Sequence, residues 1–149
     1  MKISAPDLTQ RPPRSPRVRL GGYVILPRML DKGRAKLAGK LGEFHYACPL
    51  DQQFLGFAGV NPEALLKQLK AGKGDLEILK WIAKNAKNKP TQLEILAWSR
   101  HQEARSPGDL ESRKFFSEYH RQAAPDRTDI ATWFDLLDVD DHVTFGGKP

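Results

Sequence analysis

Prolines and glycines divide this chain into short segments, and this division limits its fold more than any other feature. Proline lacks a backbone N–H and clashes with the preceding helical turn, so it opens or ends a helix rather than continuing it. From Pro27 onward, the segments between these breaks have apolar residues spaced three or four apart, as on one face of a helix. No segment alternates apolar and polar residues as a half-buried strand does. The sequence therefore predicts an all-α fold.

We expect a compact single-domain bundle of five to six helices. Helix starts are clearest at Asn61-Pro62-Glu63, which combines an N-cap, a proline in the first turn and an early acid, and at Thr91 with Glu94, which have capping-box spacing. Residues 42–59 lack a sustained period and contain Pro49 and three glycines, so a loop or a broken helix is predicted there. The expected helices cover residues 27–41, 62–70, 75–87, 91–105, 109–123 and 128–138.

The length of 149 residues fits one domain. Residues 1–16 contain four prolines with Arg11 and Arg14 among them, a composition that favours extended backbone, so we expect an N-terminal arm over 1–16 and a helical domain over 17–149. Cys48 is the single cysteine, which excludes an internal disulfide. No apolar run approaches the roughly 20 residues that cross a bilayer, and the N-terminus does not resemble a secretory signal. A cytoplasmic location without a membrane partner is expected.

The charge balance invites a nucleic-acid interpretation and also weakens it. A net charge of +6 and a pI of about 9.5 favour binding to phosphates. Residues 1–40, however, hold ten Lys/Arg and two Asp, a balance of +8, whereas residues 129–149 hold five Asp and one Lys, a balance of −4. These ends can neutralise each other within one domain. The remaining basic feature is an i,i+4 row that we expect to face water: Lys32, Lys36 and Lys40.

His45, Tyr46, Cys48 and Asp51 bring an imidazole, a phenol, a thiol and a carboxylate into one short irregular segment. In a catalytic interpretation His45 carries a proton, Cys48 acts as the nucleophile, Asp51 orients its neighbours and Tyr46 contacts a ligand. The alternative is a half-buried loop in which Cys48 packs as a small hydrophobe and His45 and Tyr46 bond to backbone. In that alternative Asp51 caps a short helix that contains Phe54, Leu55 and Phe57. Structural zinc is not expected, because one Cys and one nearby His supply only two ligands, and the pattern identifies no cofactor.

Asp31 lies three residues from both Arg28 and Arg34 on the first predicted helix, a spacing that permits helical ion pairs. One interpretation is a ladder of ion pairs that fixes this helix to its neighbours. In the other, one arginine is free to bind an anionic ligand through paired N–H groups. Arg28 is then favoured, because it lies near the helix start, where backbone N–H groups attract anions.

The chain ends with a cluster of carboxylates around Trp133 and Asp138. We expect these carboxylates at or beyond the C-terminal end of the last predicted helix, where the helix dipole opposes negative charge. Ion pairs to arginines of the arm are the default expectation, and Asp138 is selected as a candidate ligand-binding residue. Trp133 either packs in the core or lines an aromatic pocket. The arginines available for pairing are Arg11, Arg14, Arg17 and Arg19.

Two blocks of sequence carry a family resemblance. The first runs from Arg19 to Asp51 and includes Leu26-Pro27-Arg28, Asp31-Lys32, His45-Tyr46 and Cys48-Pro49-Leu50-Asp51; the second runs from Arg127 to Asp140. They resemble a bacterial family catalogued only as a domain of unknown function, number five thousand and sixty-nine, over nearly the whole chain from Ser15. The resemblance implies one intact domain, and it transfers no activity and no catalytic residue.

Three functions are compatible with the sequence. The first is a small-molecule-binding or catalytic domain, with a pocket for an anionic ligand built from residues 23–51 and the helix at 133–138. The second is a nucleic-acid or protein interaction module that uses the basic arm and the lysine row. The third is a structural or assembly role, which predicts an exposed apolar patch and a stable oligomer. We rank the three functions in that order, with the first preferred.

Overall fold

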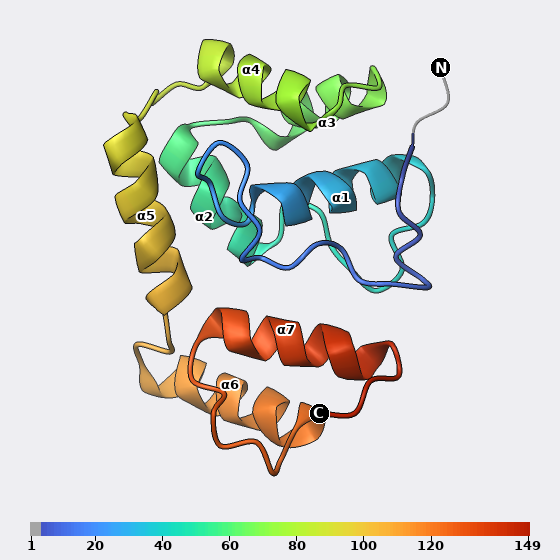
Figure 1. Cartoon of the computed structure of the whole chain (residues 1–149), viewed down its shortest axis with the longest axis vertical. Coiled ribbons are helices and arrows are strands. Elements are labelled where there is room, and N and C mark those ends of the chain that lie inside the picture. The colour runs from blue at the N-terminus through green and yellow to red at the C-terminus, as the bar shows by residue number, and fades with distance from the viewer. Residues whose placement is uncertain (1–3) are drawn as a thin grey trace.

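The computed structural model describes residues 4–149, and within this range the fold is all-helical (Figure 1). The only strand-like pairing in these residues is a single antiparallel bridge between Leu20 and Tyr23. The predicted fold class is confirmed, with one helix more than the five to six expected. The seven helices are α1 (Leu26–Leu37), α2 (Pro49–Ala58), α3 (Pro62–Lys70), α4 (Asp75–Asn85), α5 (Gln92–Ala104), α6 (Leu110–Ala123) and α7 (Trp133–Thr144).

Helix α2 lies where the sequence predicted a loop or broken helix, with a short helix capped by Asp51 as the alternative. The helix is present, but its N-cap residue is Cys48 and not Asp51. Pro49 occupies its first turn, where a missing N–H costs nothing, and Gly59 ends it with a φ of 73°. Gly56, which looked like a break, is tolerated inside the helix on an exposed side. The helix exists because Phe54, Leu55 and Ala58 are buried against the core.

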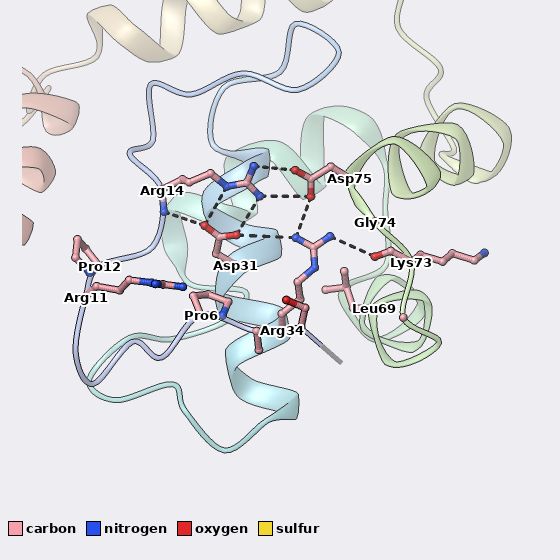
Figure 2. Close-up of a pocket in the computed structure, with 13 residues that line it drawn as sticks. Pro6, Arg11, Pro12, Arg14, Asp31, Arg34, Leu69, Lys73, Gly74 and Asp75 are labelled. Carbon is pink, nitrogen blue, oxygen red and sulfur yellow. Dashed lines mark hydrogen bonds and ion pairs between the residues drawn. The ribbon is translucent and has the colours of Figure 1, made fainter. Parts of the chain in front are cut away.

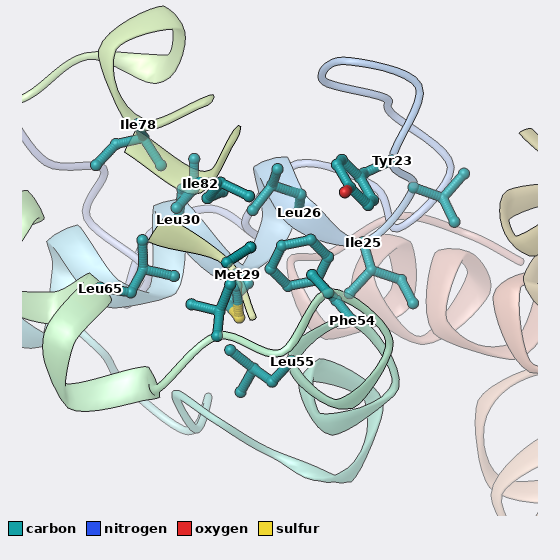
Figure 3. Close-up of a cluster of buried hydrophobic side chains, with 14 of the residues drawn as sticks. Tyr23, Ile25, Leu26, Met29, Leu30, Phe54, Leu55, Leu65, Ile78 and Ile82 are labelled. Atoms are coloured by element: carbon teal, nitrogen blue, oxygen red, sulfur yellow. The ribbon is translucent and has the colours of Figure 1, made fainter. Parts of the chain in front are cut away.

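The larger core surrounds α1, which packs against α2 and α3. Figure 3 shows the apolar side of α1 directed toward side chains of α2, α3 and α4. Leu26, Met29 and Leu30 are completely buried there, and such side chains each contribute about 1.5–3 kcal/mol. Their neighbours include Phe54, Leu65 and Ile78. The polar side of α1 is consequently enclosed by the remaining elements.

Helix α5 leads from the end of the molecule that holds α1–α4 to the end that holds α6 and α7 (Figure 1). Leu93 of this helix is 77% exposed, so its apolar side chains do not all face the core. The buried side carries Ile95 and Ser99. The Ser99 hydroxyl donates to the carbonyl of Gly22 at 2.6 Å, so a polar residue joins α5 to the chain before α1.

A smaller core lies between α6 and α7 and contains Phe116, Leu136 and Val139. Helix α7 begins at Trp133, later than predicted, and continues to Thr144. The expectation that its carboxylates cluster at the C-terminal end was wrong for Asp135, which lies in the first turn and accepts from the N–H of Thr132 at 3.0 Å. In the first turn the helix dipole stabilises this negative charge.

The N-terminal arm packs along the domain within the described residues. Leu8 is buried, and its N–H donates to the carbonyl of Lys40 at 2.9 Å. Pro13 and Pro16 are also buried, and the carbonyl of Pro16 accepts from the N–H of Ile25 at 2.9 Å. The arm therefore borders α1 and supplies side chains to its polar side. None of the helices within residues 4–149 is both long and apolar enough to cross a membrane.

Candidate functional site

The polar side of α1 carries four charged residues, three of which are buried: Arg28, Asp31 and Lys32, with Arg34 half-buried beside them. Buried charges require partners, and each of these finds its partners on other segments of the chain. Arg28 reaches α7, Lys32 reaches the start of α2, and Asp31 with Arg34 reaches the arm and α4. Helix α1 is therefore the element that positions every candidate site.

A groove of about 580 Å³ lies between the arm, α1 and the turn from α3 to α4 (Figure 2). Its floor is a network of two arginines and two carboxylates from three segments. Its lining residues are Ser4, Ala5, Pro6, Arg11, Pro12, Arg14, Asp31, Arg34, Leu69, Gly72, Lys73, Gly74 and Asp75.

Arg14 is the centre of this network. Its guanidinium lies 3.0 Å from Asp31 Oδ1 and 2.7 Å from Asp75 Oδ2. Arg34 contacts the same carboxylate of Asp75, at 2.9 Å between Nη1 and Oδ1. Burial opposes the charge on Arg14, but the hydrogen bonds that it donates to Asp75 and Asp31 outweigh this effect and raise the pKa of Arg14. Burial likewise opposes ionisation of Asp75, yet Arg14 and Arg34 together lower its pKa. Arg14 and Asp75 thus both carry their charge near neutral pH.

The groove has an excess of positive charge. Four cationic side chains line it, Arg11, Arg14, Arg34 and Lys73, against the two carboxylates of Asp31 and Asp75, which leaves two positive charges. In Figure 2 the guanidinium of Arg11 points toward the Asp31 side of the groove, whereas the side chain of Lys73 points away from the network. Among residues 4–149 Arg11 forms no ion pair. An anion in this groove would meet Arg11 first.

A second cluster lies where α1 meets the start of α2. Lys32 Nζ lies 2.9 Å from Asp51 Oδ2 and donates a hydrogen bond of 3.2 Å to Cys48 Sγ. The Lys32 side chain is 3% exposed and the Asp51 side chain 0%. Within residues 4–149 neither oxygen of Asp51 accepts a well-aligned hydrogen bond, so charge alone holds this pair. The prediction that Lys32 faces water was wrong, because α2 and its preceding loop cover that flank of α1.

The loop before α2 positions Cys48 in this cluster. Ala47 has a left-handed φ of 60°, which turns the chain so that Cys48 becomes the N-cap residue of α2. Tyr46 fixes the same loop by donating from its hydroxyl to the carbonyl of Pro62 at 2.8 Å. Burial, followed by the charges of Asp51 and Glu63, raises the pKa of Tyr46. The phenol therefore stays protonated and holds the loop against α3.

The predicted catalytic residues are brought together only in part. Cys48 and Asp51 share the amine of Lys32, a residue that the sequence interpretation did not select. His45 is exposed on the same loop and makes no hydrogen bond or ion pair among residues 4–149. A signal for Lys32 was present, because it lies three residues from the buried Met29 and three from the buried Ala35 on one stripe of the helix. None of His45, Tyr46 and Trp133 lines the groove.

The predicted ligand-binding residues are distributed over several places. Asp31 and Arg34 lie in the groove. Arg28 is not free for a ligand, because its guanidinium binds Asp141 through two contacts of 2.7 and 3.1 Å. Trp133 packs edge-on against Phe116 of α6, with ring centroids 5.2 Å apart.

The expected pairing of N-terminal arginines with the acidic tail is confirmed for Arg17 only. Arg14 and Arg19 pair with other carboxylates, and Arg11 forms no ion pair within residues 4–149. Asp138 accepts from the Ser15 hydroxyl at 2.7 Å and from Arg17 Nε at 2.9 Å. Arg17 also pairs with Asp135, and a cavity of about 300 Å³ opens beside these residues, bordered by His142. Burial opposes ionisation of Asp135, but its bonds to the N–H groups of Thr132 and Ala131 lower its pKa. Asp138 thus has protein partners on one side and a small cavity on the other.

No group of three or more His, Cys, Asp or Glu side chains within residues 4–149 is arranged to hold a metal ion. The groove and the Lys32 cluster therefore offer charge and nucleophiles rather than a metal-ligand set.

Comparison with known proteins gives one family. A search of curated proteins found no match to this chain. The family described as Domain of unknown function (DUF5069) matches residues 10–143, a span that includes the last seven residues of the arm, all of α1–α6 and all of α7 except Thr144. The match covers far more than half of the sequence, and the chain therefore belongs to the DUF5069 family.

Proposed function

We propose that this protein binds a small, multiply charged anion, such as a phosphorylated or polycarboxylate metabolite, in the groove between the arm, α1 and the α3–α4 turn. One observation carries the proposal: a groove of about 580 Å³ with two positive charges in excess. Ligand sites in proteins are concave and use a few charged groups to orient the ligand. A groove of this size accommodates a small metabolite.

The paired arginines support the proposal by being rigid. Arg14 and Arg34 are held by Asp31 and Asp75, so their side chains do not have to be ordered when an anion binds. Arg11, exposed on the arm, is the group whose donors remain for the ligand. An anion that pairs with Arg11 above a fixed positive floor gains charge-assisted hydrogen bonds at a low entropic cost.

The N-terminal end of α4 adds a further favourable contribution to anion binding in the groove. Gly72, Lys73 and Gly74 precede this helix of 11 residues and line the same groove. The partial positive charge at a helix N-terminus favours nearby anions. Asp75 and Glu77 in the first turn offset part of this effect, so the arginines supply most of the attraction.

Isothermal titration calorimetry of the full chain with inorganic phosphate, pyrophosphate and citrate at low, constant ionic strength tests the proposal. We expect saturable binding of at least one of these anions. Arg11→Gln should weaken that binding by about tenfold, because a hydrogen bond to a charged group contributes about 1.5–3 kcal/mol. The fold should remain intact, because Arg11 forms no ion pair within residues 4–149.

The matched control is Arg100→Gln, which removes the same charge from an exposed position on α5, outside the groove. If both variants weaken binding equally, the anion is attracted by net charge and the groove is not its site. Absence of saturable binding by the unmodified chain would also contradict the proposal.

The nucleic-acid alternative receives less support from the charges. The lysine row is reduced to Lys36 and Lys40, because Lys32 is buried. Three arginines of the arm and the segment after it are committed to carboxylates within the protein: Arg14, Arg17 and Arg19. Arginines with internal partners contribute little to phosphate binding.

A further inference from the structure

We infer that Lys32 and Cys48 form a redox-sensitive modification site, in which a hydroperoxide joins Cys48 Sγ covalently to Lys32 Nζ. The site is separate from the anion groove and does not depend on it. Cysteine oxidation products are known to condense with nearby nitrogen atoms when the two are held in contact.

The two reacting atoms are already in contact. Lys32 Nζ lies 3.2 Å from Cys48 Sγ, and the lysine side chain is only 3% exposed, so the amine cannot move away into water. Cys48 itself is half-buried rather than enclosed, which leaves its side of the cluster open to a molecule as small as hydrogen peroxide. Exposure of the thiol together with confinement of the amine favours a reaction between them over further oxidation.

Asp51 gives the amine a place to leave its proton. An ammonium group is not nucleophilic, so Lys32 must first become neutral. Asp51 Oδ2 lies 2.9 Å from Nζ, and neither oxygen of this completely buried carboxylate accepts a well-aligned hydrogen bond within residues 4–149. The carboxylate is therefore placed to accept the proton that the amine must lose as it reacts. A buried polar group without hydrogen bonds calls for an explanation, and a redox role supplies one here.

The reaction balances in two steps. The Cys48 sulfur attacks one oxygen of hydrogen peroxide; the S–O bond forms, the O–O bond breaks, and the leaving hydroxide takes the thiol proton to give sulfenic acid and water. The neutral amine of Lys32 then attacks the sulfur; the S–N bond forms, the S–O bond breaks, and the leaving hydroxide takes the second amine proton as water. Sulfur is oxidised by two electrons, and peroxide is reduced to two molecules of water.

The link is reversible with thiols. One thiol breaks the S–N bond, returns a proton to the nitrogen of Lys32 and forms a mixed disulfide with Cys48. A second thiol then attacks this mixed disulfide, which forms a small-molecule disulfide and restores the Cys48 thiol. While it exists, the link joins the middle of α1 to the N-cap residue of α2. The cross-link therefore records exposure to peroxide and disappears when the surroundings become reducing.

Peptide mass spectrometry of the full chain provides the test. The protein is treated with limiting hydrogen peroxide, blocked with iodoacetamide and digested with trypsin. We expect a species that joins peptide 29–34 to peptide 41–67, lighter than their sum by two hydrogen atoms, because trypsin does not cleave after a modified Lys32. A second equivalent of peroxide can transfer one oxygen atom to the link, its O–O bond breaking to leave water; this product is heavier by one oxygen atom, joins the same two peptides and supports the same site. Dithiothreitol should remove the link.

Two variants and one condition complete the test. Lys32→Arg keeps the positive charge and should abolish the link, whereas Lys36→Arg, at an exposed position on the same helix, should leave it unchanged. Treatment in guanidinium chloride should give no link. The inference is overturned if Cys48 of the unmodified folded protein proceeds to sulfinic acid or stays reduced while Lys32 remains unmodified. Equal cross-linking in the denatured chain would overturn it as well.

Discussion

Arg28 of α1 and Asp141 of α7 form a two-point ion pair in the protein interior, between residues 113 positions apart in the sequence. Their side chains are 4% and 10% exposed. The Arg28 guanidinium also lies over the ring of Phe44, 5.6 Å from its centroid. Helix α7 packs mainly on α6, and this pair joins it to α1 in addition to the burial of Phe134 in the larger core and the ion pairs of Arg17. The pair is therefore one of the contacts between the two cores.

Asp141→Asn should lower the free energy of unfolding by about 3 kcal/mol, because the buried guanidinium of Arg28 then lacks its counter-charge. Urea denaturation followed by circular dichroism measures this loss. Asp129→Asn is the control, because Asp129 also pairs with an arginine, Arg127, but is 64% exposed. Its effect should stay below about 1 kcal/mol. Equal losses from the two substitutions would contradict the role given to the Arg28–Asp141 pair.

Gly42→Ala should destabilise the protein more than Gly39→Ala, and the difference measures how firmly the arm is packed. Both glycines have a left-handed φ, 61° and 69°, so each substitution costs about 1–2 kcal/mol from backbone strain. A Cβ at Gly42 would also lie 2.9 Å from the carbonyl oxygen of Leu8, whereas one at Gly39 meets no atom within 4 Å. Thermal unfolding of the two variants gives the comparison. Identical midpoints would indicate that residues around Leu8 are not held against this turn in solution.

Capping residues in the sequence predicted those helices whose starts depend on hydrogen bonds between residues close together in the chain. Asn61 caps α3 and Thr91 caps α5 through side-chain bonds to the N–H groups of Ala64 and Glu94, and both helices lie where the sequence indicated. Helix α2 was predicted only as an alternative to a loop, because its stability comes from burial of Phe54 against other elements and not from its own pattern.

The candidate site was less predictable, because its charges are paired over long sequence separations. Pairing of the arm with the acidic tail followed from the opposite charges of the two ends, and the contacts of Arg17 with Asp135 and Asp138 confirm it. No pattern in the sequence indicates that Arg14 meets Asp75, 61 residues away, or that Lys32 is buried. Such partners are specified only when the helices pack. The groove, which depends on them, was therefore not located from sequence.

Asp140→Asn should raise the stability of the protein at neutral pH. Burial and the neighbouring charge of Asp141 raise the pKa of Asp140 above its usual 3.8. The folded state therefore disfavours the ionised form, and this penalty is present above the folded-state pKa and absent below 3.8. We expect a gain of a few tenths of a kcal/mol at pH 7, typical of removing one like-charge contact. The gain should vanish in acid. A loss of stability at pH 7 would show that Asp140 has a favourable partner instead.

Asp75→Asn should destabilise the protein at neutral pH, with a difference that shrinks in acid. Arg14 and Arg34 lower the pKa of Asp75 despite its partial burial, so its contribution is present above the usual value of 3.8 and is lost as the pH falls through the folded-state pKa. Melting temperatures of both proteins between pH 7 and strong acid should therefore converge below about pH 4. The loss of stability at neutral pH should be modest, because the Arg14 side chain is 37% exposed and water screens its ion pair with Asp75.

The control for the acid series is Asp126→Asn, which removes one carboxylate from an exposed loop position with no ion pair within residues 4–149. Its melting temperature should follow that of the unmodified protein at every pH. The same Asp75→Asn variant removes one negative charge from the groove and frees donors of Arg14 and Arg34, so anion binding there should strengthen at pH 7 while stability falls. A difference in melting temperature that stays constant or widens toward acid would mean that Asp75 stabilises the fold through packing and not through its charge.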